Sequence, residues 1–456
     1  MAAGPGAVSS QGLYRRLVRA DRSGQSKPEQ QQVARNGLRH LAANGLQAVG
    51  DQVVNARTVL PWLLSALGAP GALIALLVPV RESGSMLPQA WLAPVVERRA
   101  RRAPLWVLGA AGQALAAAGM GLAAATMTGV AAGLVLVLCL ALFSLARALC
   151  SLAGKDVLGR TVPGGQRGQI NGLVTVAGGA VAITLGLVVR GLGDVGAVAP
   201  LAALLAGAAV AWVAALLVYR RIEEPVEEVS ARGAARGDEQ PARGEGQEGG
   251  LARSWRLLRQ DPVLRHFVVV RSLLLVSALS PPFVVALAAE REGSALAGLG
   301  SFVIAQGVAA LIGGRLFGRL ADRSSRTLMA AGAGAAALVV LAFLALLAVP
   351  AARDAMLLYP AAYLLLALAH TGVRVARKTY VVDIAEGDRR TDYVAVSNTA
   401  MGVLLLVAGA VSGGLAVLGA EAALGFLSGL GLLGAVLGRR LPEAREEAAT
   451  QTRGAP

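Results

Sequence analysis

The stretch LFGRLADRSSR, residues 316–326, places three arginines and one aspartate between two long apolar runs. A second stretch of this kind, LAPVVERRARR at residues 92–102, occurs early in the chain. At a spacing of 225 residues, Asp322 aligns with Glu97 and Arg323 with Arg98. A basic cluster that ends an apolar segment would explain the arginines, but it does not explain an acidic residue at the same place in both stretches. The two stretches therefore indicate a duplicated unit with a charged connection inside each copy.

The composition predicts an all-α polytopic membrane protein. Of 456 residues, 55% are hydrophobic and 16% are charged, whereas soluble domains carry about a quarter charged residues. A spanning helix needs about 20 mainly apolar residues. We find twelve such runs, at residues 43–66, 71–96, 104–126, 129–153, 169–190, 196–219, 264–288, 298–318, 328–350, 354–374, 393–417 and 420–438.

The basic residues predict the orientation of these spans. With charges at the edges of a run counted in the adjoining connection, 36 of the 43 lysines and arginines lie in the terminal segments and the even-numbered connections, and 3 lie in the odd-numbered ones. Because cytoplasmic connections of membrane proteins are enriched in these residues, we expect a multi-pass protein of the cell membrane with both termini in the cytoplasm. This bias also accounts for the net charge of +15, so we expect no nucleic-acid partner.

The chain divides at a polar segment. Residues 223–250, EEPVEEVSARGAARGDEQPARGEGQEGG, are poor in apolar residues and rich in Gly, Glu and Arg, which is typical of a disordered linker. The predicted organisation is a basic N-terminal segment, a six-helix bundle, a cytoplasmic linker, a second six-helix bundle and a cytoplasmic tail. Their bounds are residues 1–40, 41–219, 220–263, 264–440 and 441–456.

Further matches between the halves support duplication. Lys155 aligns with Lys378 at a spacing of 223, and Pro61 aligns with Pro281 at a spacing of 220. The second spacing also places Arg271 opposite Asp51. Three matches in order, with spacings that differ by only a few residues, indicate two copies of a six-span unit.

Twelve spans, a central polar linker and a charged motif after spans 2 and 8 resemble the major facilitator superfamily (MFS). The family motif has glycine, aspartate and basic residues at fixed spacing. Its counterparts here are Gly318, Asp322, Arg323 and Arg326 in the second half, and Glu97, Arg98 and Arg101 in the first. The resemblance implies two pseudo-symmetric six-helix bundles, with these residues forming a cytoplasmic gate. It further implies a monomer in the lipid bilayer that binds a small-molecule substrate without a cofactor, with protons as the coupling ion.

Polar residues in the first two spans are candidates for the transport site. Asn44, Gln47, Asp51 and Asn55 are spaced three or four apart, so they share one face of a helix. Arg81, Ser85 and Gln89 form a similar stripe on the second span, with Glu82 beside it. Charged groups at mid-membrane are costly, so by default they indicate function.

Depth along the helices predicts the partners of these charges. At 1.5 Å per residue, Arg57 and Glu82 each lie roughly 21 Å from the cytoplasmic ends of their spans, while Asp51 and Arg147 lie roughly 12 and 9 Å deep. We therefore predict the pairs Arg57 with Glu82 and Asp51 with Arg147. Arg81 is left to meet either Asp51 or an anionic substrate.

Two roles are open for these groups. The pairs could be permanent structural contacts, or the carboxylates could take up a proton when their arginines move away. Arg147 also matches, loosely, the arginine of a helix 4 motif that the family associates with proton coupling. His370 is its counterpart in the second half and Arg271 is the counterpart of Asp51, which makes both candidates as well.

Other motifs limit the function further. Gly178, Gly179 and Gly186 resemble half of the family's antiporter signature, which also contains a proline that is missing here, and close helix packing alone would explain them. Three histidines and two cysteines provide neither a catalytic nor a metal site, so we do not expect an enzyme. Secondary transport, as proton-coupled efflux of a small organic solute, is the favoured function. Proton-coupled uptake of an anionic solute, or a sensor or scaffold that has lost transport, are the alternatives.

Overall fold

The computed structural model describes residues 10–18, 26–97, 99–193, 196, 198–225, 256, 258–291, 296–355, 357–384 and 389–442. Its first half contains α1 (Ser10–Leu17), α2 (Lys27–Val53), α3 (Val59–Ala66), α4 (Gly71–Met86), α5 (Gln89–Glu97), α6 (Ala103–Thr126), α7 (Gly129–Thr161), α8 (Gly164–Gly191) and α9 (Val198–Tyr219). Its second half contains α12 (Pro262–Leu273), α13 (Val276–Arg291), α14 (Leu296–Arg323), α15 (Ser325–Leu347), α16 (Pro350–Arg353), α17 (Leu358–Asp383), α18 (Arg389–Ala416) and α19 (Ala420–Gly438).

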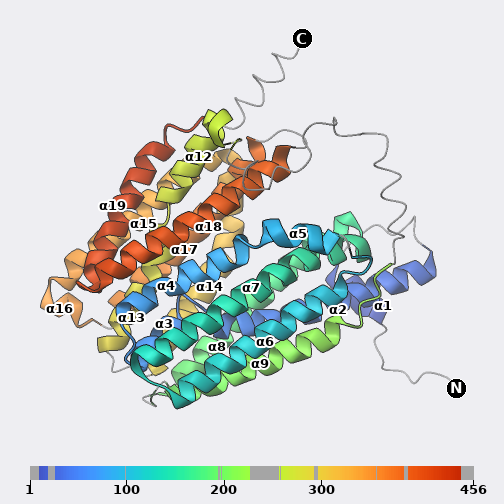
Figure 1. Ribbon diagram of the computed structural model, residues 1–456, viewed down its shortest axis with the longest axis horizontal. Coiled ribbons are helices and arrows are strands. Elements are labelled where there is room, and N and C mark those ends of the chain that lie inside the picture. The colour runs from blue at the N-terminus through green and yellow to red at the C-terminus, as the bar shows by residue number, and fades with distance from the viewer. Residues whose placement is uncertain are drawn as a thin grey trace, which may run out of the picture.

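The long helices form two bundles of six rods each (Figure 1). In each half the first rod consists of two helices in line, α2 with α3 and α12 with α13, and the second rod of the first half is α4 with α5. Every predicted run coincides with one rod. Within the described residues, nine helical segments are long and apolar enough to cross a membrane. The runs at residues 43–66, 71–96 and 298–318 fall outside this group. The first is divided between α2 and α3 and the second between α4 and α5, while the third is represented by a shorter apolar segment, Ala297–Gly313.

Several helices extend beyond the predicted runs. Helix α2 begins at Lys27, inside the predicted basic segment 1–40, because Ser26 and Glu29 form a capping box. The Ser26 hydroxyl accepts from the Glu29 N–H at 3.5 Å, and the Glu29 carboxylate accepts from the Ser26 N–H at 2.8 Å. Helix α17 continues to Asp383, past the predicted end at residue 374. Polar helix ends therefore project beyond the apolar part of several rods.

The first rod of each half is interrupted at equivalent positions. Helix α2 ends at Val53 and α3 begins at Val59, while Leu274 and Leu275 separate α12 from α13. The two breaks are related by the same spacing of 220 residues as the Pro61 and Pro281 match. In the first break the Asn55 side-chain oxygen accepts a hydrogen bond from the Arg57 N–H at 2.9 Å. Broken helices at matching positions are typical of transporter binding sites.

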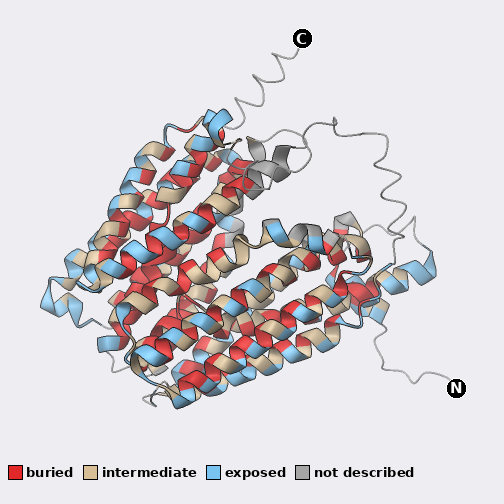
Figure 2. Ribbon diagram, in the orientation of Figure 1, coloured by how far each residue is buried: buried red, intermediate tan, exposed pale blue. Residues whose placement is uncertain are grey.

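The outward faces of the bundles are apolar. Leu115 on α6 and Leu138 on α7 are 69% and 70% exposed, and Figure 2 shows exposed residues along the outer sides of the helices and buried residues between them. A water-soluble protein rarely exposes apolar surface on this scale. The molecule is therefore a multi-pass membrane protein with its outer faces in lipid.

The two bundles meet at one end, through glycine contacts between α8 and α14. A Cβ on Gly186 would lie 2.7 Å from the Ile304 side chain, and one on Gly300 would lie 2.6 Å from the Gly186 carbonyl. About two turns further along both helices, a Cβ on Gly307 would lie 3.0 Å from the Gly179 carbonyl. Small residues allow this close approach, so helix packing is the structural role of Gly179 and Gly186.

The bundles separate at the other end, which we name the linker end, because α9 ends and α12 begins there (Figure 1). Helix α2 packs mainly on α8 and α9 of its own half, and α12 packs on α18 and α19 of the second half. Their continuations α3 and α13 pack against each other at the opposite end, where the two bundles meet. Each broken rod therefore runs from the end where the bundles meet to the linker end, and its break lies between these two ends.

Candidate functional site

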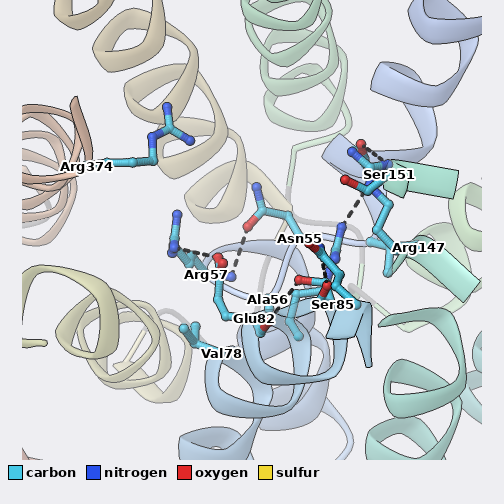
Figure 3. Close-up of a pocket in the computed structure, with 13 residues that line it drawn as sticks. Asn55, Ala56, Arg57, Val78, Glu82, Ser85, Arg147, Ser151 and Arg374 are labelled. Carbon is cyan, nitrogen blue, oxygen red and sulfur yellow. Dashed lines mark hydrogen bonds and ion pairs between the residues drawn. The ribbon is translucent and has the colours of Figure 1, made fainter. Parts of the chain in front are cut away.

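A cavity of about 370 Å³ lies where the first rod breaks, between the two bundles (Figure 3). It is lined by Asp51, Val54, Asn55, Ala56, Arg57, Val78, Arg81, Glu82, Ser85, Gln89, Arg147, Ser151 and Arg374. The first rod, α4 and α7 supply most of this lining, and α17 supplies one arginine from the second half. Seven of the nine substrate or coupling candidates of the sequence analysis are in this set.

The predicted pair of Arg57 with Glu82 is present. The Arg57 guanidinium lies 2.9 Å from the Glu82 carboxylate, and the two side chains are 18% and 31% exposed. The interruption after α2 brings Arg57 to the cavity, because residues 54–58 leave the helical path and turn toward α4. The ion pair thus ties the break of the first rod to the second rod.

The predicted pair of Asp51 with Arg147 is also present, and Arg81 joins it. The Asp51 carboxylate lies 2.8 Å from the Arg147 guanidinium and 3.3 Å from that of Arg81. Each arginine also lies over an aromatic ring, Arg81 at 4.9 Å from the centre of Phe143 and Arg147 at 6.0 Å from that of Trp212. Of the two partners predicted for Arg81, the structure contains Asp51. Arg81 and Arg147 therefore each contact both the Asp51 carboxylate and an aromatic ring.

Arg374 differs from these arginines. It approaches the cavity from α17, on the side opposite Arg147 in Figure 3, and no dashed contact reaches it. Among the described residues it has no hydrogen bond or salt bridge, and the same holds for Arg377, one turn further along α17. Both arginines are close enough to Glu82 to act on it electrostatically.

Neither Arg374 nor Arg377 was predicted from the sequence as a site residue. The predicted span ended at residue 374, so both were counted among the basic residues of the following connection. The internal repeat carried a usable signal, since the spacing that aligns Lys378 with Lys155 also aligns Arg374 with Ser151. Ser151 lines the same cavity, so pseudo-symmetric positions face it from both halves.

The lining carries an excess of positive charge. Four arginines face two carboxylates, which leaves two positive charges on the cavity wall. Asn55 and Gln89 add neutral polar groups, and the Gln89 amide donates to the Ser85 carbonyl at 2.7 Å. A smaller cavity of about 210 Å³ shares Arg147 and Ser151 with this one and is lined by Asn44 and Gln47 as well.

Two predicted candidates lie away from the cavity. Arg271 is buried on α12, where it donates to the Ser397 hydroxyl and, at 3.0 Å, to the Asn398 side-chain oxygen. His370 is buried on α17, 3.3 Å from the Ser277 hydroxyl. Neither residue lines the cavity. The repeat positions opposite Asp51 and Arg147 are thus occupied by groups that contact their own half.

The predicted gate motif is only partly described. Arg98, the surroundings of Gly318 and the side chains of Glu97 and Asp322 lie outside the described part. Arg101 and Arg323 are exposed, and Arg326 donates to the Leu441 carbonyl at 3.0 Å. The gate function of the motif stays a prediction.

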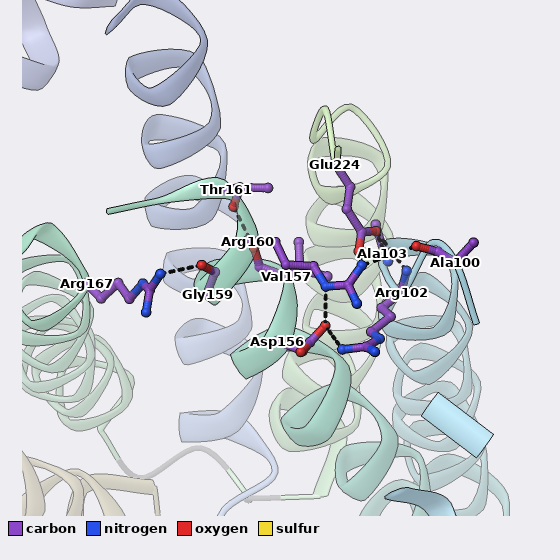
Figure 4. A network of polar contacts seen from close by, with 10 residues as sticks. All are labelled: Ala100, Arg102, Ala103, Asp156, Val157, Gly159, Arg160, Thr161, Arg167 and Glu224. Carbon is purple, nitrogen blue, oxygen red and sulfur yellow. Dashed lines mark hydrogen bonds and ion pairs between the residues drawn. The ribbon is translucent and has the colours of Figure 1, made fainter. Parts of the chain in front are cut away.

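A neighbouring network ties the linker end of the first bundle together (Figure 4). The Glu224 carboxylate accepts from the N–H groups of Arg102 and Ala103 at 2.7 and 2.9 Å, at the start of α6. Such a position suits an anion because the first N–H groups of a helix lack helical partners. Asp156 forms salt bridges with Arg102 and, at 2.8 Å, with Arg160.

Glu223 makes a second set of contacts beside this network. Its carboxylate lies 3.0 Å from the Arg39 guanidinium and 3.3 Å from that of Arg35, both on α2. The hydrogen bond from Arg39 holds the pKa of Glu223 below its ordinary value, and Arg35 adds to this effect. Glu223 and Glu224 belong to the predicted linker 220–263, but they attach its first residues to α2, α6 and α7.

Comparison with known proteins identifies the fold. A family model described as Major Facilitator Superfamily matches residues 46–359. A search of curated protein sequences found no match to this chain.

Among solved structures, an inward open conformation of the xylose transporter XylE from E. coli superposes with a TM-score of 0.63 at 14% identity, covering 91% of this chain and 99% of that one. A nucleoside transporter, NupG, gives a TM-score of 0.67 at 12% identity, covering 89% and 99%. A bacterial homologue of the iron transporter ferroportin gives 0.61 at 15% identity, covering 93% and 100%. At these identities the likeness concerns the fold, and together with the family model it shows that this chain belongs to the Major Facilitator Superfamily of membrane transporters.

Proposed function

We propose that this protein transports a small organic solute by alternating access, with protons as the coupling ion and the 370 Å³ cavity as the solute site. The observation that carries the proposal is the cavity itself, which lies between the two bundles at the break of the first rod. Rocking of one bundle against the other would close the linker end and open the glycine-packed end. On the basic-residue count, the linker end is the cytoplasmic one.

The paired carboxylates support the coupling role. Asp51 and Glu82 both face the cavity, and each is paired with arginine rather than buried in an apolar core. Glu82 pairs with a residue of the broken segment, which is the part of the first rod best placed to change when the bundles move. Separation of Arg57 from Glu82 would leave the carboxylate free to take up a proton.

The lining charges favour one of the two directions left open by the sequence. The favoured function there was proton-coupled efflux, and the alternative was uptake of an anionic solute with a proton. A wall with two uncompensated positive charges suits an anion better than a cation or a neutral solute. We therefore propose proton-coupled uptake of an anionic solute in place of proton-coupled efflux.

Transport in proteoliposomes tests the proposal. Solutes are added with and without an imposed pH gradient, and accumulation above the external concentration is measured. We expect uphill accumulation for wild type, and its loss in Asp51→Asn and Glu82→Gln with the protein still inserted. Asp354→Asn is the matched control, because it removes a carboxylate that is 76% exposed and pairs with Arg291 outside the cavity. Wild-type accumulation in both cavity variants would remove these carboxylates from the coupling role.

A further inference from the structure

The first observation concerns arginine without a partner. Arg374 lines the cavity, and neither it nor Arg377 has a hydrogen bond or a salt bridge within the described residues. Positive side chains inside a membrane protein are normally paired. Here Arg374 lines the cavity, Arg377 lies one helical turn further along α17, and neither has an ion-pair partner among the described residues.

The second observation is the contrast with the first half. Arg57, Arg81 and Arg147 each have a carboxylate within 3.3 Å. These three groups are occupied, so a negatively charged ligand would compete with Asp51 or Glu82 for them. Arg374 and Arg377 offer their donors without such competition. Arginine binds carboxylate and phosphate groups well because its planar guanidinium presents two parallel N–H donors.

We propose, on the basis of the proposed transport function, that Arg374 and Arg377 bind the oxyanion group of a small organic acid, and that a proton taken up at Glu82 strengthens this binding. The solute class is therefore a carboxylate or phosphate compound small enough for the cavity. Because the proton and the anion favour each other's binding, they move across the membrane in the same direction.

The proton linkage follows from the charges around Glu82. Arg57 pairs with Glu82 at the break at 2.9 Å. Arg81 on the same helix and Arg374 and Arg377 on α17 are close enough to act on Glu82 electrostatically. Asp51 and Arg147 are the other charged groups of the wall, while His370 lies one turn before Arg374. From α18, the Gly402 carbonyl accepts a hydrogen bond from Ser83, next to Glu82.

A charged Glu82 therefore attracts the same two arginines that the anion requires. Its protonation removes one negative charge from the wall and raises the excess from two positive charges to three. By linkage, if a proton on Glu82 tightens anion binding, the bound anion favours the proton by the same factor. With a cationic solute, protonation of Glu82 would weaken solute binding, and this opposite sign of the coupling favours exchange of the solute for the proton.

Stability without ligand is the first test. Two like charges one turn apart, with no ion-pair partner among the described residues, destabilise the empty protein. Arg374→Gln and Arg377→Gln should each raise the Tm of the purified full-length protein by about 2 °C. Arg439→Gln is the control, since Arg439 is an exposed arginine of the second half outside the cavity, and its Tm should be unchanged. An unchanged or lower Tm in both α17 variants would overturn the view that these arginines await a ligand.

Binding of defined anions is the second test. Sulfate and succinate are titrated at constant ionic strength against chloride, and the rise in Tm is measured, with uncharged succinamide for comparison. We expect saturable stabilisation by at least one oxyanion, none by succinamide, and affinity about tenfold weaker in Arg374→Gln and Arg377→Gln. Arg439→Gln should bind as wild type does. Equal affinity in the α17 variants and wild type, or no stabilisation by either anion, would overturn the site.

The proton linkage is tested with sulfate, which stays divalent in neutral and mildly acidic solution, so that any pH dependence belongs to the protein. Wild type should bind sulfate more tightly as the pH falls. Glu82→Gln, which imitates the protonated carboxyl, should bind at neutral pH as tightly as wild type does in acid and should show little pH dependence. Wild-type affinity that is constant, or that weakens on acidification, would overturn the linkage.

These measurements record binding and not transport. A chain that binds oxyanions through Arg374 but does not accumulate any solute would pass these tests and fail the proteoliposome test of the proposed function. A protein that accumulates a solute uphill but does not bind oxyanions would pass the proteoliposome test and fail these binding tests.

Discussion

The two halves of this transporter share one fold but use charge differently at the cavity. In the first half three arginines are fixed by two carboxylates, and two of the three also lie over aromatic rings. In the second half Arg374 and Arg377 have no such partners within the described residues. The difference shows that the first half neutralises most of its own positive charge at the cavity, whereas the second half contributes one arginine that has no ion-pair partner among the described residues.

The largest effect is expected from Asp51→Asn, which would make the first half resemble the second. The substitution leaves Arg81 and Arg147 without a carboxylate in a partly buried site, so we expect a loss of about 3 kcal/mol in unfolding free energy. Unfolding of the protein in lipid nanodiscs measures this loss. Asp354→Asn, which breaks an exposed pair, should cost less than about 1 kcal/mol. Equal losses in unfolding free energy for the two variants would mean that the Asp51 ion pairs stabilise the protein no more than an exposed pair does.

A double-mutant cycle on Arg57 and Glu82 is expected to give the next largest effect. Because the side chains are 18% and 31% exposed, we expect a coupling energy of about 1–2 kcal/mol between Arg57→Gln and Glu82→Gln. Denaturant unfolding of the four proteins yields the value. The same cycle on Arg374 and Glu82 should give clearly less, and a larger value there would show that Arg374 belongs with the paired arginines.

Ser151→Arg introduces into the first half the residue that the second half has at the equivalent repeat position. Ser151 lines the cavity beside Arg147, so a further positive charge should destabilise the empty protein by about 1 kcal/mol. Sulfate should recover part of this loss, which thermal unfolding with and without the salt would detect. If the variant is as stable as wild type and indifferent to sulfate, the excess charge on the wall has no energetic consequence.

The smallest effect is expected at Glu223, an exposed carboxylate of the first half that pairs with Arg39 and Arg35. Arg39 and Arg35 lower the pKa of this carboxyl, so its contribution to stability is complete above the ordinary value of 4.5 and is lost as the pH falls through the lower folded value. Glu223→Gln should therefore reduce stability slightly at neutral pH, by less than about 1 kcal/mol. Unfolding curves should show this difference from wild type vanish in acid, and a difference that grows in acid would contradict the assignment.

Much of the fold could be predicted because span length and apolarity are local properties. The run at 420–438 coincides with α19, and the ion pair of Arg57 with Glu82 followed from depth along two helices. The break at residues 54–58 was not predicted, since the polar stripe of the first run was compatible with a continuous helix. Arg374 was missed because an arginine at the end of an apolar run has the same sequence pattern whether it faces a cavity or the solvent.

Contacts of the linker show the same limit. Glu224 belongs to a segment whose composition is typical of disorder, and yet its carboxylate binds the first N–H groups of α6. Composition describes the whole segment, whereas the contact depends on one side chain and on where α9 ends. The spatial neighbours of a charge, more than its sequence context, decide whether it is paired or free.

The sign of proton movement tests the central claim most directly. Proteoliposomes that contain a pH-sensitive dye are given an inward gradient of the oxyanion that stabilises the protein best, without an imposed pH gradient. The account predicts that the lumen becomes acidic as the anion enters, that Glu82→Gln abolishes the acidification, and that Arg439→Gln leaves it unchanged. A lumen that becomes alkaline, or anion entry without any change in lumenal pH, would contradict joint movement of the anion and the proton.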